Sequence, residues 1–235
     1  MRRPLSRIAK LFQNAKQPTR SANKAPRFNV EHLEDRVVPA NFTITGANLS
    51  ISLNVNETLT VTDTMGNTTF AINNGNFTQV GGDAPVANNG ANIVVTDAQL
   101  AVSLTVNNAA AAANTNNTTN GVIFSGNGTT DNIVSNTISV SIVDADLGAD
   151  VDDVQFNGLL LNTGTTGTAS ISTANGAITS PGMGTDVDSS QLTLIAPNGI
   201  GTGAAPITTT ISNIEAVSSG ITGVFIANTT NTTRP

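Results

Sequence analysis

The chain has 235 residues and carries ten Lys and Arg against sixteen Asp and Glu, which gives a formal net charge of −6. Nine of the ten cations precede position 37, and the chain contains no Cys, Trp or Tyr. The long acidic remainder repels phosphate backbones and so argues against nucleic acid as a partner. The lack of Cys excludes a disulfide framework, and no apolar run reaches the roughly 18 residues that would predict a membrane-spanning helix.

Residues 1–40 form a basic head. Leu5, Ile8 and Leu11 recur at helical spacing among the cations, and Pro18 ends the pattern. A short amphipathic helix and a disordered basic tail both fit this pattern, and the two alternatives stay open. The head lacks the apolar stretch of about 7–15 residues that an ordinary signal peptide needs. We expect the head to contact a membrane surface or the export machinery, and its lone His32 predicts no metal or catalytic site.

Residues 30–40 have the sequence VEHLEDRVVPA. This segment resembles the block V-E-x-L-E-D-R-x-x-P-A near the start of many large planctomycete-type exported and surface proteins. In those proteins the block follows an Arg/Lys-rich leader and precedes a β-rich region. The resemblance implies export and therefore predicts an extracellular or cell-surface location for this chain.

Residues 41–235 predict an all-β body. Apolar residues alternate with Thr, Ser and Asn in short runs, which is typical of strands with one buried face. These runs cover residues 42–45, 49–55, 59–61, 93–95, 102–106, 138–142, 192–194 and 224–226. Turns are predicted at Asn74-Gly75, Gly81-Gly82, Asn89-Gly90, Asn120-Gly121, Asn175-Gly176 and Asn198-Gly199. No segment past Pro39 has a convincing helical period, and residues 109–113, a run of Ala flanked by Asn, are expected to form a loop.

The body also repeats itself. Residues 169–176 align with residues 192–199 at an offset of 23, and a weaker copy covers residues 214–221. Residues 121–124 and 223–226 are similar to each other as well. A period in the low twenties with short strands and frequent turns is typical of one coil of a β-solenoid, whose coils bury their apolar faces by stacking on their neighbours.

The last third of the chain contains a recognisable series of short motifs: L-x-L at 192–194, G-I-G-T at 199–202, P-I-x-T at 206–209 and G-x-F-I-x-N-T at 223–229. It is similar to the repeat of filamentous-haemagglutinin-type surface proteins, in which such coils build a right-handed parallel β-helix. The resemblance implies that fold for residues 41–235 as one body, with a possible subdivision near 155–165. The alternative is a β-sandwich over residues 41–155 followed by a short solenoid.

The densest group of carboxylates lies in the middle of the body. Carboxylates spaced along a Gly-containing loop match the oxygen ligands that Ca²⁺ takes, so this group is a candidate calcium site, with a solvated acidic loop as the alternative. The candidate ligands are Asp144, Asp146, Asp150, Asp152 and Asp153. No catalytic residue and no other cofactor-binding residue is predicted, because residues 37–233 contain no Lys, Arg or His to assist an acid or a hydroxyl.

These features together predict a non-catalytic, exported structural or adhesive module of the cell surface. Its expected partners are other surface proteins or polysaccharide, and no cofactor is expected apart from the candidate calcium ion. The alternative is a carbohydrate-binding or carbohydrate-cleaving β-helix protein that uses pairs of Asp, since two carboxylates are chemically sufficient for glycoside cleavage.

Overall fold

The structure of the chain is a computed structural model, and it describes residues 39–229 except 55, 65, 109–119, 129 and 144–151. The basic head up to residue 38 and the predicted loop at 109–113 therefore lie outside the described residues. The predicted all-β class is confirmed, because one helix of four residues accompanies eighteen strands in the described part of the chain. The described residues belong to one compact unit.

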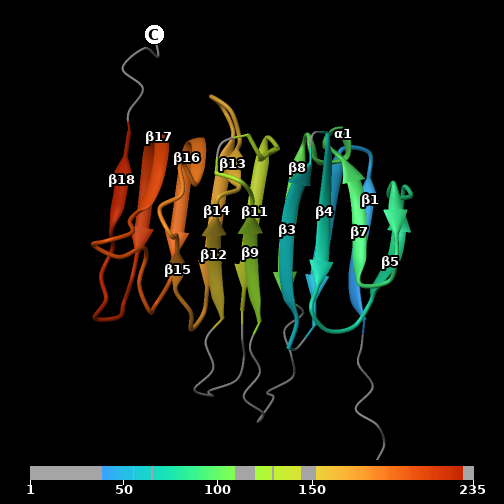
Figure 1. The fold of residues 1–235 in the computed structure, drawn as a ribbon, viewed down its shortest axis with the longest axis horizontal. Coiled ribbons are helices and arrows are strands. Elements are labelled where there is room, and N and C mark those ends of the chain that lie inside the picture. The colour runs from blue at the N-terminus through green and yellow to red at the C-terminus, as the bar shows by residue number, and fades with distance from the viewer. Residues whose placement is uncertain are drawn as a thin grey trace, which may run out of the picture. The chain divides into compact units, whose positions relative to one another are not determined.

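The strands form two sheets, here called sheet A and sheet B. Part of sheet B can be followed from left to right in Figure 1 as β12, β9, β3, β4 and β7. Sheet A contains β1 (Ala40–Thr45), β2 (Asn48–Leu53), β5 (Phe77–Gly82), β8 (Ser103–Asn108), β10 (Asn132–Val134), β11 (Thr137–Ile142), β13 (Leu160–Asn162), β14 (Thr168–Thr173), β16 (Val187–Ile195), β17 (Ile207–Val217) and β18 (Ile226–Asn228). Sheet B contains β3 (Thr58–Thr64), β4 (Asn67–Ile72), β6 (Ala87–Asn88), β7 (Asn92–Thr96), β9 (Gly121–Ser125), β12 (Asp153–Asn157) and β15 (Ile178–Thr179).

Most of sheet A is one parallel ladder, here called ladder A, in the order β2, β8, β11, β14, β16 and β17. Residues at equivalent positions of these strands pair directly and so form a column across the sheet. The first column is Leu49, Leu104, Ile138, Ala169, Leu192 and Ile214. Ala169 pairs with Leu192, which are the two positions that the 23-residue offset in the sequence equates.

Sheet B contains a second parallel ladder, here called ladder B, through β3, β9, β12 and β15. Isolated bridges extend it to Ile200 and Val224. Its first column is Leu59, Val122, Val154, Ile178, Ile200 and Val224. Val122 and Val224 thus occupy one column, in agreement with the similarity between residues 121–124 and 223–226. A third parallel series joins β10, β13 and the first halves of β16 and β17 to β18.

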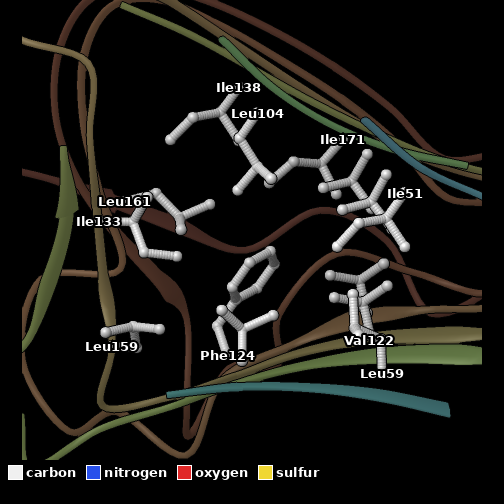
Figure 2. Packing of buried hydrophobic residues seen from close by; sticks show 14 of the residues in the cluster. Ile51, Leu59, Leu104, Val122, Phe124, Ile133, Ile138, Leu159, Leu161 and Ile171 are labelled. Carbon is white, nitrogen blue, oxygen red and sulfur yellow. The ribbon is translucent and has the colours of Figure 1, made fainter. Parts of the chain in front are cut away.

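The inward-facing residues of these ladders converge on one apolar interior. Figure 2 shows Ile51, Leu104, Ile138 and Ile171 of sheet A opposite Leu59, Val122 and Phe124 of sheet B, with Ile133, Leu159 and Leu161 on a third side. All of these side chains are fully buried. Phe124 stacks on Phe156, with ring centroids 5.7 Å apart and planes inclined by 19°. Alternation of buried and exposed side chains along each strand is what fixes this interior, because a shift of one residue would turn every apolar side chain outward.

Antiparallel strands form the N-terminal end of both sheets. β1 pairs antiparallel with β2, and β4 lies between β3 and β7 with antiparallel pairing on both sides. At this edge of sheet A, β5 pairs in parallel with β1, across a register shift between Phe42 and Thr43. Gly82 in β5 has φ +85°, and a Cβ there would collide with the carbonyl oxygen of Ile44. Short, bulged strands are a common way to block the edge of a sheet.

Three local predictions were wrong. Gly81 and Gly82 lie in β5 instead of a turn, because the missing side chains allow the close approach to β1. Gly121 begins β9 instead of ending a turn, because it pairs with both Thr58 and Asp153. The part of the body past Pro39 also contains a helix, α1 (Asp97–Leu100), in which the Thr96 N–H donates to Gln99 Oε1 at 3.0 Å. One helical turn is too short to produce a periodic sequence signal.

The predicted alternative of a sandwich ending near residue 155 has no counterpart in the strand pairing. β11, which precedes this point, pairs in parallel with β14, which follows it. In sheet B, β12 spans residues 153–157 and pairs with both β9 and β15. Each sheet therefore continues through the middle of the described chain.

Replacing Phe124 with Ala tests the apolar interior. We expect Phe124→Ala to lower the free energy of unfolding by about 3–5 kcal/mol, because the change removes a fully buried ring and leaves a cavity against Phe156. Urea titration followed by circular dichroism measures the loss. Phe225, which is 40% exposed, provides the control, since Phe225→Ala should cost about 1 kcal/mol or less. Equal losses in the two variants would contradict the assignment of Phe124 to the core.

Candidate functional site

The predicted calcium ligands divide between two parts of the chain. Asp144, Asp146 and Asp150 lie outside the described residues, whereas Asp152 and Asp153 stand at the start of β12. The described residues contain no group of three or more His, Cys, Asp or Glu that could hold a metal ion. The calcium site therefore stays a prediction, and His32 also lies outside the described residues.

Asp152 and Asp153 both accept main-chain hydrogen bonds from neighbouring strands of ladder B. Asp152 is fully buried, and its Oδ1 accepts from the Asn120 N–H at 2.7 Å, just before β9. Asp153 Oδ1 accepts from the Ala177 N–H at 2.7 Å, just before β15. The two carboxylates thus hold the preceding and the following strand. This arrangement gives both residues a structural role whether or not calcium binds nearby.

Asp152 belongs to a row of polar residues at the turns that lead from ladder A to ladder B. The Glu57 N–H donates to Asn120 Oδ1 at 3.1 Å, and the Asp152 N–H donates to Asn175 Oδ1 at 3.3 Å. Further along, Asn198 Nδ2 donates to the carbonyl oxygen of Asn175. Each of these bonds joins one turn to the next, so the Asn side chains connect successive turns. We call Glu57, Asn120, Asp152, Asn175 and Asn198 the polar row.

The polar row also requires a glycine. A Cβ on Gly176 would collide with the carbonyl oxygen of Asp152. The Gly176 N–H instead donates to Thr173 Oγ1 at 2.8 Å, and this hydroxyl in turn donates to the Asp152 carbonyl oxygen at 2.6 Å. Position 176 therefore requires glycine, because the Asn175-Gly176 turn lies close to the main chain of Asp152. An alanine at this position would force the two turns apart.

Glu57 ends the polar row with a buried carboxylate, 1% exposed. Its Oε2 accepts from the Asn54 N–H at 2.7 Å, closing a tight turn in which Asn56 has φ +64°. Burial raises the pKa of the Glu57 carboxyl above its ordinary value of 4.5, while the main-chain donors of Asn54 and Ala40 act in the opposite direction. In the sequence, residues 56 and 57 lie in the gap between the alternating runs 49–55 and 59–61. The signal available there was an acid placed between two alternating apolar runs.

Asp186 is a second buried carboxylate, and it also joins successive strands. Its Oδ1 accepts from Ser180 Oγ at 2.9 Å, and its Oδ2 accepts from the Thr208 N–H at 2.8 Å. Burial raises the pKa of Asp186 to about 6, while the Thr208 and Ser180 donors act to lower it. Both oxygens are engaged, so Asp186 fastens β17 to the segment that precedes β16.

Asp63 forms a third acidic centre, close enough to Asp97 and Asp131 for their charges to act on it. Asp63 Oδ2 accepts from the Asn132 N–H at 3.4 Å, a long bond, and its Oδ1 is buried without a described partner. Burial raises the pKa of Asp63, the Asn132 donor lowers it, and the Asp97 and Asp131 charges raise it further. Beside this centre lies an open pocket of about 150 Å³, lined by residues that include Thr130, Asp131, Asn132 and Thr185.

The pocket has a mostly polar lining with few groups that could take part in catalysis. Asp131 is its one carboxylate, and this group accepts bonds from the Asn127 N–H at 3.0 Å and from Thr130 Oγ1 at 3.3 Å within its own turn. Glycoside cleavage uses two carboxyl groups about 5–10 Å apart across the scissile bond. The residues that line this pocket supply one of the two.

Comparison of the chain with protein-family models, with curated proteins and with solved structures gave no match. No described helix is long and apolar enough to cross a membrane.

The calcium prediction can be tested through the stability of the whole chain. If Asp144 and Asp146 help to bind Ca²⁺, saturating calcium should raise the melting temperature, since a ligand present at 100 times its Kd adds about 2.7 kcal/mol to the stability of the folded state. Differential scanning calorimetry in Ca²⁺ and in chelator measures the shift. The double variant Asp144→Asn, Asp146→Asn is the control and should lose it. Identical melts of the unmodified chain in the two buffers would eliminate the site.

Asp186 predicts a defined pH dependence of stability. Its pKa in the folded chain, about 6, lies above the ordinary 3.8, so the folded state holds the proton more tightly. The resulting stabilisation is complete below about pH 4 and is lost as the pH rises through about 6. We expect Asp186→Asn to gain stability relative to the unmodified chain between pH 4 and 7, as measured by urea unfolding at each pH. Exposed Glu215 provides the control, and a Glu215→Gln chain should keep the pH dependence of stability of the unmodified chain. The same pH dependence in Asp186→Asn and in the unmodified chain would refute the role of Asp186.

Proposed function

We propose that the parallel ladders within residues 41–235 belong to a right-handed parallel β-helix of the filamentous-haemagglutinin type, to which antiparallel strands are added at the N-terminal end. We propose further that the chain is a non-catalytic structural or adhesive module exported to the cell surface. The parallel ladders are the main observation that supports this proposal. In the last part of ladder A, the paired residues 169, 192 and 214 are 23 and 22 residues apart. In the last part of ladder B, the paired residues 154, 178, 200 and 224 are 24, 22 and 24 residues apart. Such spacing is typical of one β-helix coil per repeat.

The chemistry of the described surface supports a structural or adhesive role. Outward positions on the ladders are mostly Thr, Ser and Asn, as in the row Ser50, Thr105, Ser139, Ser170 and Thr193 of sheet A. The Asp152 and Asp186 carboxylates accept hydrogen bonds from neighbouring segments of the chain, and the Glu57 carboxylate accepts one within its own turn. Regular rows of hydroxyl and amide groups suit contact with polysaccharide or with other surface proteins. Residues 30–40 resemble the block found near the start of exported planctomycete-type proteins, and this resemblance supports the export part of the proposal.

The proposal predicts where the protein is found. In the native host, fractionation with an antibody against the body should place the chain outside the cytoplasm, on the surface or in the medium. Mass spectrometry of that fraction should show a chain shortened at its N-terminus, with the cut before β1, because the exported-protein block precedes the β-rich region. Recovery of the intact chain in the cytoplasm alone would contradict both export and the surface role.

The alternative function, cleavage of carbohydrate, can be tested with the purified protein. Incubation with a panel of neutral and acidic polysaccharides should release no reducing ends and no unsaturated products if the chain is non-catalytic. Release that disappears in an Asp131→Asn chain would favour the carbohydrate-cleaving alternative and locate it at the pocket beside β10. Retention of a polysaccharide without cleavage would agree with the adhesive role.

A further inference from the structure

Seven Asn residues of this chain are followed directly by Gly, and all seven dipeptides lie within the described residues. The amide of an Asn is chemically labile before Gly, because glycine has no side chain to hinder its own main-chain nitrogen. That nitrogen can attack the amide carbon of the Asn side chain once the two atoms approach each other. The seven residues are Asn74, Asn89, Asn120, Asn127, Asn157, Asn175 and Asn198.

Hydrogen bonds hold the glycine N–H in five of the seven dipeptides. An N–H that donates such a bond points at its acceptor, and the bond must open before the nitrogen can turn toward the Asn side chain. The acceptors are the carbonyl oxygens of Glu57, Gly158 and Ala196 for Gly121, Gly128 and Gly199, the Asn88 side chain for Gly90 and the Thr173 hydroxyl for Gly176.

The Asn157-Gly158 dipeptide is held by its stacking on β9. Asn157 is the last residue of β12 and pairs with Ser125. Its carbonyl oxygen accepts from the Gly126 N–H at 2.9 Å, and the Gly158 carbonyl oxygen accepts from the Gly128 N–H at 2.8 Å. The main chain on both sides of the reacting nitrogen is therefore fixed by the neighbouring turn.

Asn74 differs from the other six. It lies in the turn between β4 and β5, and its side chain is exposed. Among the described residues, neither the Asn74 side chain nor the Gly75 N–H takes part in a hydrogen bond. The turn is anchored through Asn73 instead, whose Oδ1 accepts from the Thr58 N–H at 2.8 Å and whose N–H donates to the Thr58 carbonyl oxygen at 3.2 Å. The Asn74 amide and the Gly75 nitrogen can therefore approach each other without any of these bonds opening.

We propose that Asn74 is a site of spontaneous modification, at which the folded protein converts a side-chain amide to a carboxylate. The Gly75 nitrogen forms a bond to Asn74 Cγ, the bond from Cγ to Nδ2 breaks, and the proton of the Gly75 N–H leaves with Nδ2 as ammonia. One water molecule then opens the cyclic imide. Hydrolysis at the side-chain carbonyl gives aspartate, and hydrolysis at the main-chain carbonyl gives isoaspartate.

Either product adds one negative charge to the turn, and isoaspartate also lengthens the main chain there by one atom. The anchors on both sides do not involve Asn74, since Asn73 is bonded to Thr58 and the Phe77 N–H donates to the Gly90 carbonyl oxygen at 2.8 Å. The folded chain therefore tolerates the conversion and accumulates a more acidic form with age. This inference is independent of the proposed surface function.

Peptide mapping of the folded, full-length chain during incubation in mildly alkaline buffer tests the proposal. Trypsin is unsuitable because residues 37–233 contain no Lys or Arg, whereas chymotrypsin cuts after Phe70 and Phe77 and releases residues 71–77. Liquid chromatography with mass spectrometry separates the asparagine, aspartate and isoaspartate forms, and fragmentation distinguishes Asn74 from Asn73 and Asn76. We expect Asn74 to convert at least roughly tenfold faster than any of the other six, because those must first open local structure.

The same chain in guanidinium chloride is the control for the fold, and there all seven dipeptides should convert at similar rates. In the matched variant Asn74→Gln, cyclisation needs a larger ring, so the fast conversion should disappear from residues 71–77, and a thermal melt shows that this variant folds. A second dipeptide that converts as fast as Asn74 in the folded chain would overturn the proposal. An equal preference for Asn74 in guanidinium chloride would overturn it as well, because the preference would then come from local sequence instead of the fold.

Discussion

Main-chain pairing between successive parallel strands is the interaction on which this structure depends. Neighbouring strands lie about 4.8 Å apart, so a residue must stack directly on its equivalent in the strands before and after it. This spacing explains why the columns are uniform, with Leu, Ile, Val and Ala inside and Thr, Ser and Asn outside. It also explains why Gly176 is needed, because the turns stack as closely as the strands do. A side chain at that position has no space.

The same constraint accounts for the buried acids. Where the chain leaves one sheet for the other, main-chain N–H groups lose their partners in the ladder and still need acceptors. Glu57, Asp152 and Asp186 provide them, each accepting an N–H at 2.7–2.8 Å. Burial raises the pKa of Glu57 and Asp186, which is the electrostatic cost of placing a charge in the interior. Charged acceptors form stronger bonds than neutral ones, and this offsets part of that cost.

Sequence alone was sufficient for the elements in which alternation is clear. β2, β7, β8 and β11 follow the predicted runs closely, and the offset of 23 residues gave the register of β14 against β16. It was insufficient where tertiary contacts decide. β4 has the sequence NTTFAI, whose alternation is weak, and it becomes a strand because β3 and β7 pair with it on both sides. The buried state of Asp186 could not be foreseen, because its partners, Ser180 and the Thr208 N–H, come from separate segments. Density in the sequence singled out Asp152, which is buried, but it missed Glu57 and Asp186, which are buried and lie outside the dense group.

The connections from ladder A to ladder B differ greatly in length. Four residues separate β2 from β3 and β14 from β15, ten separate β11 from β12, and twelve separate β8 from β9. The columns on either side keep their pairing regardless. Lengthening a loop is thermodynamically mild, about 0.6 kcal/mol for each doubling. This corner is therefore the place where such a protein can acquire new surface through insertions during evolution, while the framework that displays it stays the same.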